Sequence, residues 1–276
     1  MRILVVGGSG HLGRSLVRRA LAAGHRTAST YHRRPAPEGT PDGVDRYRLD
    51  IRDPDRIAAL FRRFAPDAVV TCVSGGADRE VTADGPARVA RIAAETGVRL
   101  VHVSSDAVFA GDRAAAYTED DAPDPVTPYG VAKADADAAV LAAHPGALVG
   151  RPSLVVGDGR SRHERLVLDL AAGRRAGALF TDEIRCPVHV ADLAEALLEG
   201  AARGLSGVLH LGGADPVSRY ELGRLLARRH GFDPGALPTA RRADSGLPGG
   251  VDVRLDSTRA ARLLTTELRG ARAFLS

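Results

Sequence analysis

Short apolar runs alternate with amphipathic segments along the first half of the chain. Apolar runs bounded by glycine or polar residues are typical of strands that are buried on both faces of a parallel sheet. Apolar residues that recur every three or four positions predict helices between these strands. The predicted strands are 3–6, 25–30, 47–51, 68–73, 99–103 and 147–150, and the predicted helices are 12–23, 54–64, 80–95 and 129–143. This alternation predicts an α/β fold with a doubly wound parallel sheet.

The second half of the chain shows shorter elements and more loops. The predicted elements are a helix that ends near 172, a helix over 188–198 with a strand-like start, a strand over 208–211, a helix over 220–230 capped by Ser218, and a final helix capped by Asp256-Ser257-Thr258. Residues 111–128 and 234–250 are predicted loops. We therefore expect a small α/β lobe in addition to the sheet.

A glycine-rich turn follows the first strand: Gly7-Gly8-Ser9-Gly10-His11-Leu12-Gly13 gives G-x-x-G-x-x-G. Gly7 permits a tight turn, Gly10 lets the backbone approach a pyrophosphate, and Gly13 lets the helix pack against the strand. A strand, a glycine turn and a helix in this order are typical of a Rossmann dinucleotide site, although a plain tight turn is the alternative. The predicted cofactor contacts in this turn are Gly7, Ser9, Gly10, His11, Leu12 and Gly13.

The end of the second strand carries arginines where an NAD site usually has an acid. Tyr31-His32-Arg33-Arg34 is followed by no carboxylate before Glu38. Arg33 and Arg34 could clamp a 2′-phosphate, so we predict NADPH over NADH, with NADH still possible; two solvated loop arginines are the alternative. The other predicted cofactor contacts lie at the ends of the third and fourth strands: Asp50 and Ile51, where adenine could rest, and Cys72, Val73 and Ser74.

One lysine stands out in the composition. Of 38 lysines and arginines, only Lys133 is a lysine, and it lies four residues after Tyr129. On a helix this spacing places the phenol and the ammonium on one face, where the cation stabilises tyrosinate and makes Tyr129 a better proton donor. Chance is the alternative, because a lone lysine follows one of five tyrosines at this distance in about 2% of cases. Pro128 is well placed to start the helix.

Composition excludes several other classes of function. A net charge of +4 with scattered arginines, 4% aromatic residues and no tryptophan argues against nucleic-acid binding. No apolar run approaches the ~20 residues of a membrane span, and the N-terminus lacks the pattern of a secretory signal. Two cysteines without metal spacing and nine dispersed histidines predict no metal site and favour a cytoplasmic setting. G-x-S-x-G does not occur, which argues against a serine hydrolase.

Four blocks occur in an order and spacing that resemble the extended short-chain dehydrogenase/reductase superfamily: the glycine turn, Ser104-Ser105-Asp106, Tyr129-x-x-x-Lys133 and Arg151-Pro152. Residues 101–111, 128–133 and 180–194 are similar to its dTDP-4-dehydrorhamnose reductase-like, or sugar-nucleotide reductase, branch. Ala107 and Ala110 depart from that branch, which usually has tyrosine and aspartate there. These departures border the expected sugar position, so they leave the substrate open while the catalytic residues are intact.

The resemblance implies roles for individual residues. Tyr129 would protonate the carbonyl oxygen, Lys133 would lower the pKa of Tyr129 and bind the nicotinamide ribose, and Ser105 would orient the carbonyl. Ser105 is preferred to Ser104 because it aligns with the family's catalytic serine or threonine. Side chains alternate along a strand, so only one of the two can easily face the site. The resemblance implies Tyr129, Lys133 and Pro152 as further cofactor contacts, and Ser105, Asp106, Ala107, Arg151 and Arg185 as substrate contacts.

The resemblance also implies an organisation and an activity. Residues 1–150 would form an NAD(P)-binding Rossmann domain with core strands that extend to about residue 210, and residues 151–276 would form mainly an interleaved, small C-terminal α/β substrate-binding lobe. The implied activity is NADPH-dependent reduction of a nucleotide-linked keto-sugar or a related small ketone, and a homodimer is the candidate assembly. The alternatives are an epimerase or dehydratase of the same superfamily, and a non-catalytic NADP-binding regulatory subunit.

Arg160, Arg162 and His163 could meet a diphosphate or could be solvated loop charges.

Overall fold

Two compact, discontinuous units make up the chain in a computed structural model that describes residues 1–33 and 43–276. Unit 1 comprises Met1–Ser105, Pro128–Arg151 and Ala194–Leu209. Unit 2 comprises Asp106–Thr127, Pro152–Leu193 and His210–Ser276. Residues 106–127 therefore cluster with unit 2, although they precede residue 150. The assignment of the units to cofactor and substrate binding stays a prediction.

A seven-stranded sheet forms the centre of unit 1, in the order β11-β6-β5-β4-β1-β2-β3. The pairings from β6 to β3 are parallel, with Leu4 of β1 opposite Val69 of β4 and Ala28 of β2. The strands are β1(Arg2–Val6), β2(Arg26–Tyr31), β3(Asp45–Arg48), β4(Ala68–Thr71), β5(Arg99–Val103), β6(Leu148–Pro152) and β11(Gly207–Leu211). The predicted doubly wound parallel sheet is confirmed.

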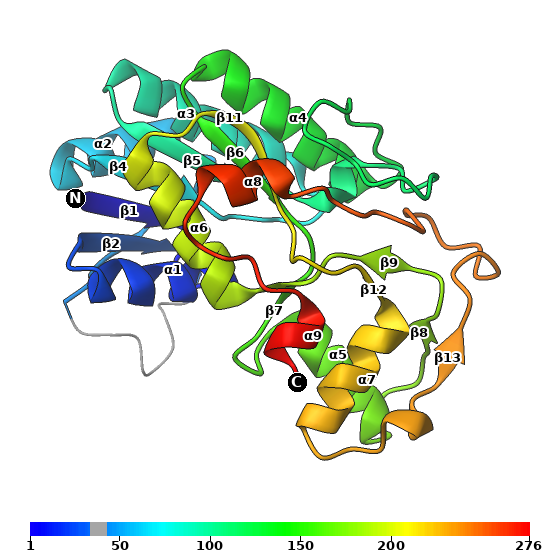
Figure 1. Cartoon of the computed structure of the whole chain (residues 1–276). Helices are drawn as coiled ribbons and strands as arrows, with labels where there is room; N and C mark the ends of the chain where they lie inside the picture. The colour runs from blue at the N-terminus through cyan, green and yellow to red at the C-terminus, as the bar shows by residue number, and fades with distance from the viewer. Residues whose placement is uncertain (34–42) are drawn as a thin grey trace. The chain divides into compact units, whose positions relative to one another are not determined.

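Helices cover both faces of this sheet (Figure 1). They are α1(His11–Ala22), α2(Pro54–Phe64), α3(Gly85–Glu95), α4(Pro128–Ala143) and α6(Val190–Arg203). Leu4 and Val6 of β1 belong to one core cluster with residues of α2, α3 and α4, whereas Ile3 and Val5 are equally buried but lie outside it. Because side chains alternate along a strand, β1 buries apolar residues on both faces. This explains its unbroken apolar run.

The order of the strands creates a ligand position at the carboxyl end of the sheet. The chain moves from β1 through β2 to β3 on one side, and α2 then carries it back to β4 on the other side of β1. Ligands bind where the strand order reverses in this way. Gly7, which follows β1, lies against Cys72 and Val73, which follow β4.

Unit 2 is built from short elements around its own apolar cluster. Val167 and Leu170 of α5, Leu222 and Leu226 of α7, and Phe274 of α9 are buried together. The elements are η2(Asp106–Val108), β7(Val155–Val156), α5(Arg162–Ala171), β8(Leu179–Phe180), β9(Ile184–Arg185), β10(Val188–His189), β12(Val217–Ser218), α7(Arg219–Arg229), η3(Pro234–Ala236), β13(Thr239–Ala240), α8(Thr258–Leu263) and α9(Ala271–Phe274). The short strands pair as β7 with β10, β8 with β13 and β9 with β12.

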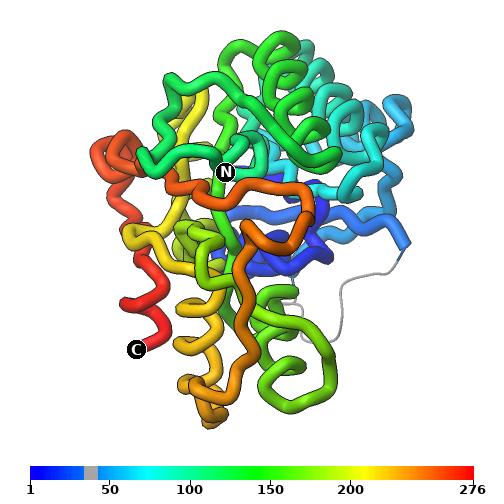
Figure 2. The backbone as a smooth tube through the Cα atoms, turned by 90° about the vertical axis from the view of Figure 1, so that its right-hand side faces the viewer, coloured from blue at the N-terminus to red at the C-terminus, as the bar shows by residue number. Residues whose placement is uncertain are grey.

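Two long segments of unit 2 run side by side. In Figure 2 the orange segment near residue 250 passes along the green segment that precedes α4. Isolated parallel β-bridges join Asp112 to Asp252 and Tyr117 to Leu255. The Tyr117 amide donates a hydrogen bond to the Arg254 carbonyl at 2.7 Å. These bonds order a region that the sequence predicts only as loop.

Local signals predicted several boundaries correctly. The Asp53 carboxylate accepts a hydrogen bond from the Arg56 amide at the start of α2, and the Ser218 hydroxyl accepts one from the Glu221 amide at the start of α7. At the final predicted helix, Asp256 caps Thr258, while the Ser257 hydroxyl is bonded to Gly212. The expectation for Ser257 is therefore wrong, because a backbone partner distant in sequence takes its hydroxyl.

The predicted helix over 80–95 is not uniform. Its first part, η1(Glu80–Asp84), is a π-helix, and α3 begins only at Gly85. Pro86 follows at the start of α3 and has no amide hydrogen to donate to a preceding turn, which accounts for the irregular geometry before it. The short helix α9 and the pairing of β8 with β13 had no periodic signal, because each is too short to show one.

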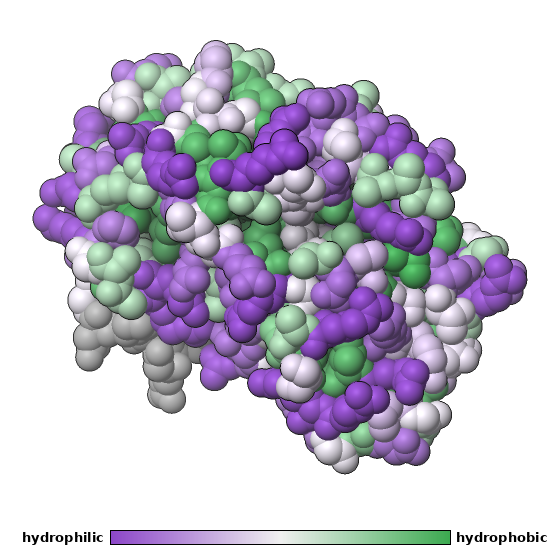
Figure 3. Space-filling view, viewed as in Figure 1, coloured by the Kyte–Doolittle hydropathy of each residue, from purple (hydrophilic) through white to green (hydrophobic). Residues whose placement is uncertain are grey.

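The exposed surface carries few large apolar side chains. On the face in Figure 3, apolar residues occur in separate groups between polar ones. The exposed large apolar residues in the described ranges are Met1, Val126, Val131, Leu247 and Leu263. Among the helices of residues 1–33 and 43–276, none has the length and hydropathy that crossing a membrane requires.

We predict that Gly13→Ala destabilises unit 1. A Cβ atom at Gly13 would lie 2.2 Å from the Gly7 carbonyl oxygen and 2.7 Å from Gly8 Cα, so α1 would have to move away from the turn. Urea unfolding is expected to show a free energy of unfolding lower by about 1–3 kcal/mol. Gly146→Ala is the control, because its Cβ would meet its nearest neighbour at 3.4 Å. Equal unfolding midpoints for the two variants would contradict the prediction.

Candidate active site

The glycine turn is held in a conformation that needs glycine at several points. Gly7 has a φ of +96°, and a Cβ at Gly8 would lie 2.5 Å from Ser29 Cβ. The Gly10 amide donates to the Gly7 carbonyl at 3.1 Å and closes the turn. Gly10 is exposed and starts α1 without a side-chain cap and without an acid in the first turn. The first amides of α1 and its dipole therefore favour an anion.

A cavity of about 650 Å³ opens beside this turn, at the point where the strand order reverses. The predicted cofactor residues that line it are Gly7, Ser9, Gly10, Arg33, Asp50, Ile51, Cys72, Val73 and Ser74. The sequence motifs do not predict the remaining lining residues: Val6, Thr30, Tyr31, His32, Leu49, Arg52, Gly75, Asp78 and Val81. The predicted contacts His11, Leu12, Gly13, Tyr129, Lys133 and Pro152 do not line it, and Arg34 lies outside the described residues.

The charges around this cavity are partly paired. Arg52 donates to the Asp50 carboxylate through Nε at 2.9 Å and through its terminal nitrogen at 2.7 Å. These bonds hold the pKa of Asp50 well below its usual range. His32 Nε2 lies 3.5 Å from the same carboxylate, and Arg33 is exposed at the end of β2. Arg52 follows Asp50 by two residues, so its position in the sequence could have revealed it.

Lys133 is buried beneath the end of β5. Its side chain is only 2% exposed, and its Nζ donates to the Val103 carbonyl at 2.9 Å. Burial lowers the pKa of Lys133 to about 8, and the nearby Asp137 carboxylate works against this lowering. Tyr129 lies one helical turn earlier on α4 and is half-buried. The amine is thus held in a fixed place on the same helix as a more accessible phenol.

The residues after β5 differ in exposure. Ser104 is buried, whereas Ser105 is half-buried. This alternation favours Ser105 as the hydroxyl that a ligand reaches. Its contact with a substrate stays a prediction.

Arg151 does not lie on an open surface. It is 4% exposed, and its Nε donates to the Asp137 carboxylate at 2.9 Å. This ion pair favours a supporting role for Arg151 within unit 1 over direct contact with a substrate. The burial of Arg151 could not be read from its sequence position, because Asp137 lies on a separate element.

Three other predicted substrate residues lie in unit 2. Asp106 is buried and accepts a hydrogen bond from the Ser153 hydroxyl at 2.6 Å. Arg185 Nε lies 3.7 Å from the Asp106 carboxylate. Ala107 is half-buried beside Asp106 in η2.

The guanidinium of Arg185 has several internal partners. It donates to the carbonyls of Ile184 at 2.7 Å, Gly250 at 2.8 Å and Val251 at 3.2 Å, and its side chain is 12% exposed. Burial lowers the pKa of Arg185. These bonds tie β9 to the segment near residue 250, so any role in binding would be added to a structural one.

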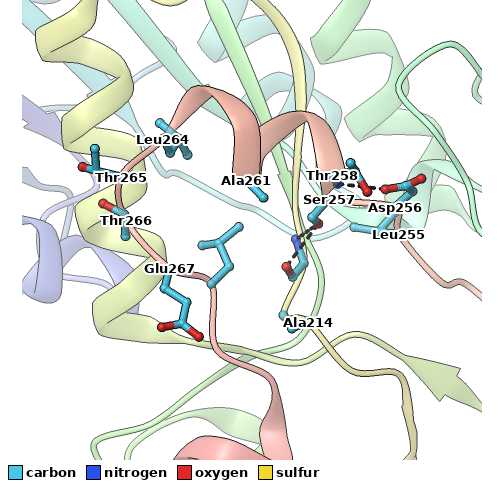
Figure 4. Close-up of a pocket in the computed structure, with 13 residues that line it drawn as sticks. Ala214, Leu255, Asp256, Ser257, Thr258, Ala261, Leu264, Thr265, Thr266 and Glu267 are labelled. Carbon is cyan, nitrogen blue, oxygen red and sulfur yellow. Dashed lines mark hydrogen bonds between the residues drawn. The ribbon is translucent and has the colours of Figure 1, made fainter.

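Unit 2 has a second cavity of about 480 Å³ between residues 212–214 and 255–268. Figure 4 shows Thr265, Thr266 and Glu267 on the loop after α8. Asp256 and Thr258 lie at the start of α8. The two carboxylates, Asp256 and Glu267, disfavour the phosphates of a dinucleotide. Within the described ranges, no three histidine, cysteine, aspartate or glutamate side chains are grouped as metal ligands would be.

Comparison with known proteins identifies the family. The RmlD substrate binding domain matches residues 1–248. The chain is 33% identical over 249 residues to a dTDP-4-dehydrorhamnose reductase of Mycobacterium tuberculosis, and the matched region covers 84% of this chain and 77% of that protein. It is 25% identical over 245 residues to methionine adenosyltransferase 2 subunit beta of Mus musculus, and this matched region covers 82% of this chain and 71% of that protein.

A solved structure agrees with the fold. The dTDP-4-dehydrorhamnose reductase of Bacillus anthracis, in complex with NADP, has a TM-score of 0.81 at 20% identity and covers 99% of this chain and 96% of that chain. At this identity the likeness concerns the fold alone. The predicted resemblance is confirmed by the family match and by the mycobacterial relative. The chain belongs to the RmlD substrate binding domain family, and with it to the NAD(P)-dependent oxidoreductases of the extended short-chain dehydrogenase/reductase type.

Proposed function

We propose that the protein is an NADPH-dependent reductase of a nucleotide-linked keto-sugar or a related small ketone. The observation that carries this proposal is the position of Lys133, which is buried under the end of β5 one helical turn after Tyr129. Burying an ammonium is costly, so a chain that otherwise uses arginine has reason to retain a lysine there. The mycobacterial relative, a dTDP-4-dehydrorhamnose reductase, supports the substrate class.

The residues of unit 1 fit a dinucleotide. The open amides of α1 suit its pyrophosphate, and the adjacent cavity, lined by Asp50 and Ile51, suits its adenosine. Gly13 supports this fit, because a Cβ there would push α1 away from the turn. Arg33 at the end of β2 suits a 2′-phosphate, which favours NADPH.

The chain's own residues supply position and a proton, and NADPH, when bound, supplies the hydride. Tyr129 donates its phenolic proton to the carbonyl oxygen as the carbonyl carbon is reduced, so the ketone becomes an alcohol and Tyr129 becomes a tyrosinate. Lys133 stabilises that tyrosinate as a nearby cation. The Ser105 hydroxyl donates a hydrogen bond to the same carbonyl oxygen and orients it.

Unit 2 is the proposed binding lobe for the sugar nucleotide. Asp106, Ala107 and Arg185 lie in it, and the bonds of Arg185 to Ile184 and Gly250 give the lobe a fixed frame. Ala107 replaces the larger tyrosine that the reductase branch usually has, and this difference favours a sugar other than the one that branch reduces. The cytoplasmic setting and the homodimer stay predictions.

Two other activities fit the residues of the site less well than reduction does. An epimerase or dehydratase would regenerate its cofactor, but a dehydratase would need an Asp-Glu pair in place of Ser105-Asp106. The mouse relative is named as a subunit of methionine adenosyltransferase 2. A non-catalytic NADP-binding regulatory subunit would have no need of Ser105, Tyr129 and Lys133 together. The intact set favours the reductase.

We predict that Tyr129→Phe retains NADPH binding and loses turnover. Loss of a positioned general acid is expected to lower kcat by about 10²–10⁴-fold, because only the phenolic proton is removed. Steady-state NADPH oxidation with a panel of nucleotide-linked ketones, together with NADPH binding by fluorescence, measures both effects. Tyr47→Phe is the control, since its ring packs under Arg63 in unit 1. Undiminished turnover in Tyr129→Phe would overturn the mechanism.

We predict a preference for NADPH that depends on Arg33. Arg33→Ala is expected to lower kcat/KM with NADPH by roughly 10–100-fold, the range for a charge-assisted hydrogen bond, and to leave the value with NADH unchanged. Arg62→Ala, an exposed arginine on α2, is the matched control. Equal efficiency of the wild-type protein with NADH and NADPH would refute this assignment.

A further inference from the structure

Beneath the proposed active site, unit 1 buries a group of ionisable side chains. Lys133 and Asp137 are each 2% exposed, and Arg151 is 4% exposed. Asp137 follows Lys133 by four residues on α4, the spacing that also separates Lys133 from Tyr129. Residues at this spacing lie on one face of a helix, so Lys133 has the phenol one turn before it and a carboxylate one turn after it.

Two side chains of the sheet, Arg151 and His102, lie close to Asp137. Arg151 on β6 donates through Nε to Asp137 Oδ2 at 2.9 Å. His102 on β5 has its Nε2 at 3.9 Å from Asp137 Oδ1, and its Nδ1 is 2.9 Å from the Thr71 hydroxyl. Burial, helped by the charge of Lys133, holds the pKa of His102 well below its ordinary value. His102 is therefore neutral and adds no charge.

The other groups around Lys133 are neutral as well. Cys72 at the end of β4 is a thiol at neutral pH, because burial raises its pKa to about 12. The Val103 carbonyl and the hydroxyls of Ser104 and Ser105 follow on β5 and at its end. Burial raises the pKa of Asp137, while the charges of Arg151 and Lys133 favour its carboxylate form. With Asp137 as that carboxylate, the charged members are two cations, Lys133 and Arg151, and one anion. The group carries one net positive charge, which a Tyr129 tyrosinate would neutralise.

We propose that Asp137 is the buried counter-ion that keeps Lys133 in its cationic form, and that Arg151 positions Asp137 and limits its influence. Asp137 is a positioning residue, since it acts through Lys133 and not on the reacting atoms. The catalytic consequence rests on the proposed reductase function. The coupling between Asp137 and Lys133 does not, because it is a property of the protein without substrate.

The signs of the expected effects follow from the charges. Burial alone lowers the pKa of Lys133, and the charge of Asp137 works against this lowering. Removal of the Asp137 charge must therefore lower the pKa of Lys133 further. Removal of the Arg151 charge must raise the pKa of Lys133, because Lys133 is then the only cation of the group beside the Asp137 carboxylate. If Asp137 and Arg151 only brace α4 against β6, neither change would follow these signs.

The sole lysine makes the coupling directly measurable. Full-length protein labelled with ¹³C,¹⁵N-lysine gives one lysine side chain by NMR, that of Lys133, which can be titrated without cofactor or substrate. The wild-type protein is expected to titrate at about 8. Asp137→Asn is expected to titrate lower by about 1 unit or more, the usual size of one nearby charge. Asp137→Glu, which keeps the charge, is expected to restore the wild-type titration.

Asp135→Asn is the matched control for loss of a carboxylate. Asp135 lies on the same helix, but it is exposed and paired with Arg79. Its replacement is expected to leave the titration of Lys133 unchanged. A folded Asp137→Asn protein with the wild-type titration would overturn the proposal. If Asp137→Asn does not fold, Arg151→Met decides: a raised pKa of Lys133 supports the proposal, and an unchanged or lowered one overturns it.

A pH profile extends the test to catalysis. In Asp137→Asn the alkaline limb of kcat is expected to move to lower pH by the same amount as the NMR titration, with the KM for NADPH unchanged. An unshifted limb beside a shifted titration would overturn the catalytic part. If the wild-type protein reduces none of the ketones tested, the proposed function fails, and the titration still decides the coupling.

Discussion

The hydrogen bond from the Lys133 ammonium to the Val103 carbonyl joins the helix α4 to the end of β5, and the proposed chemistry depends on it. A cation that is 2% exposed stays in place only where polar groups and opposite charge replace water. The parallel sheet meets this need, because β4, β5 and β6 end side by side and bring Cys72, Val103 and Arg151 to one edge. Secondary structure thus positions a charge that the sequence shows only as an isolated lysine.

The glycine turn obeys a second constraint, which is steric. Gly8 and Gly13 have no room for a Cβ, since the backbone of the turn and Ser29 occupy that space. The close approach leaves the start of α1 open and the cavity between β1 and β4 accessible. The two constraints lie in one unit, so the positions proposed for cofactor and proton donor are set by a single sheet.

Much of the fold could be predicted, because its signals are local. Unbroken apolar runs predicted β1 and β5, and Asp53 and Ser218 predicted helix starts that hydrogen bonds confirm. The π-helix over η1 and the helix α9 were missed, since a single proline and a four-residue helix leave no periodic pattern. In the candidate site, the glycine turn and the tyrosine–lysine spacing were readable for the same reason.

The environment of individual arginines could not be predicted. Arg151 and Arg185 look like cations available to a substrate, yet the first pairs with buried Asp137 and the second bonds to backbone carbonyls near residue 250. Their partners are distant in sequence, and only the fold brings them together.

The most direct test of the account is reduction with NADPH that carries deuterium at the transferred position. With a nucleotide-linked keto-sugar, we predict one NADP formed per alcohol, with the deuterium on the former carbonyl carbon. Conversion of the sugar without net NADPH oxidation, or cofactor binding without any conversion across the panel, would contradict it.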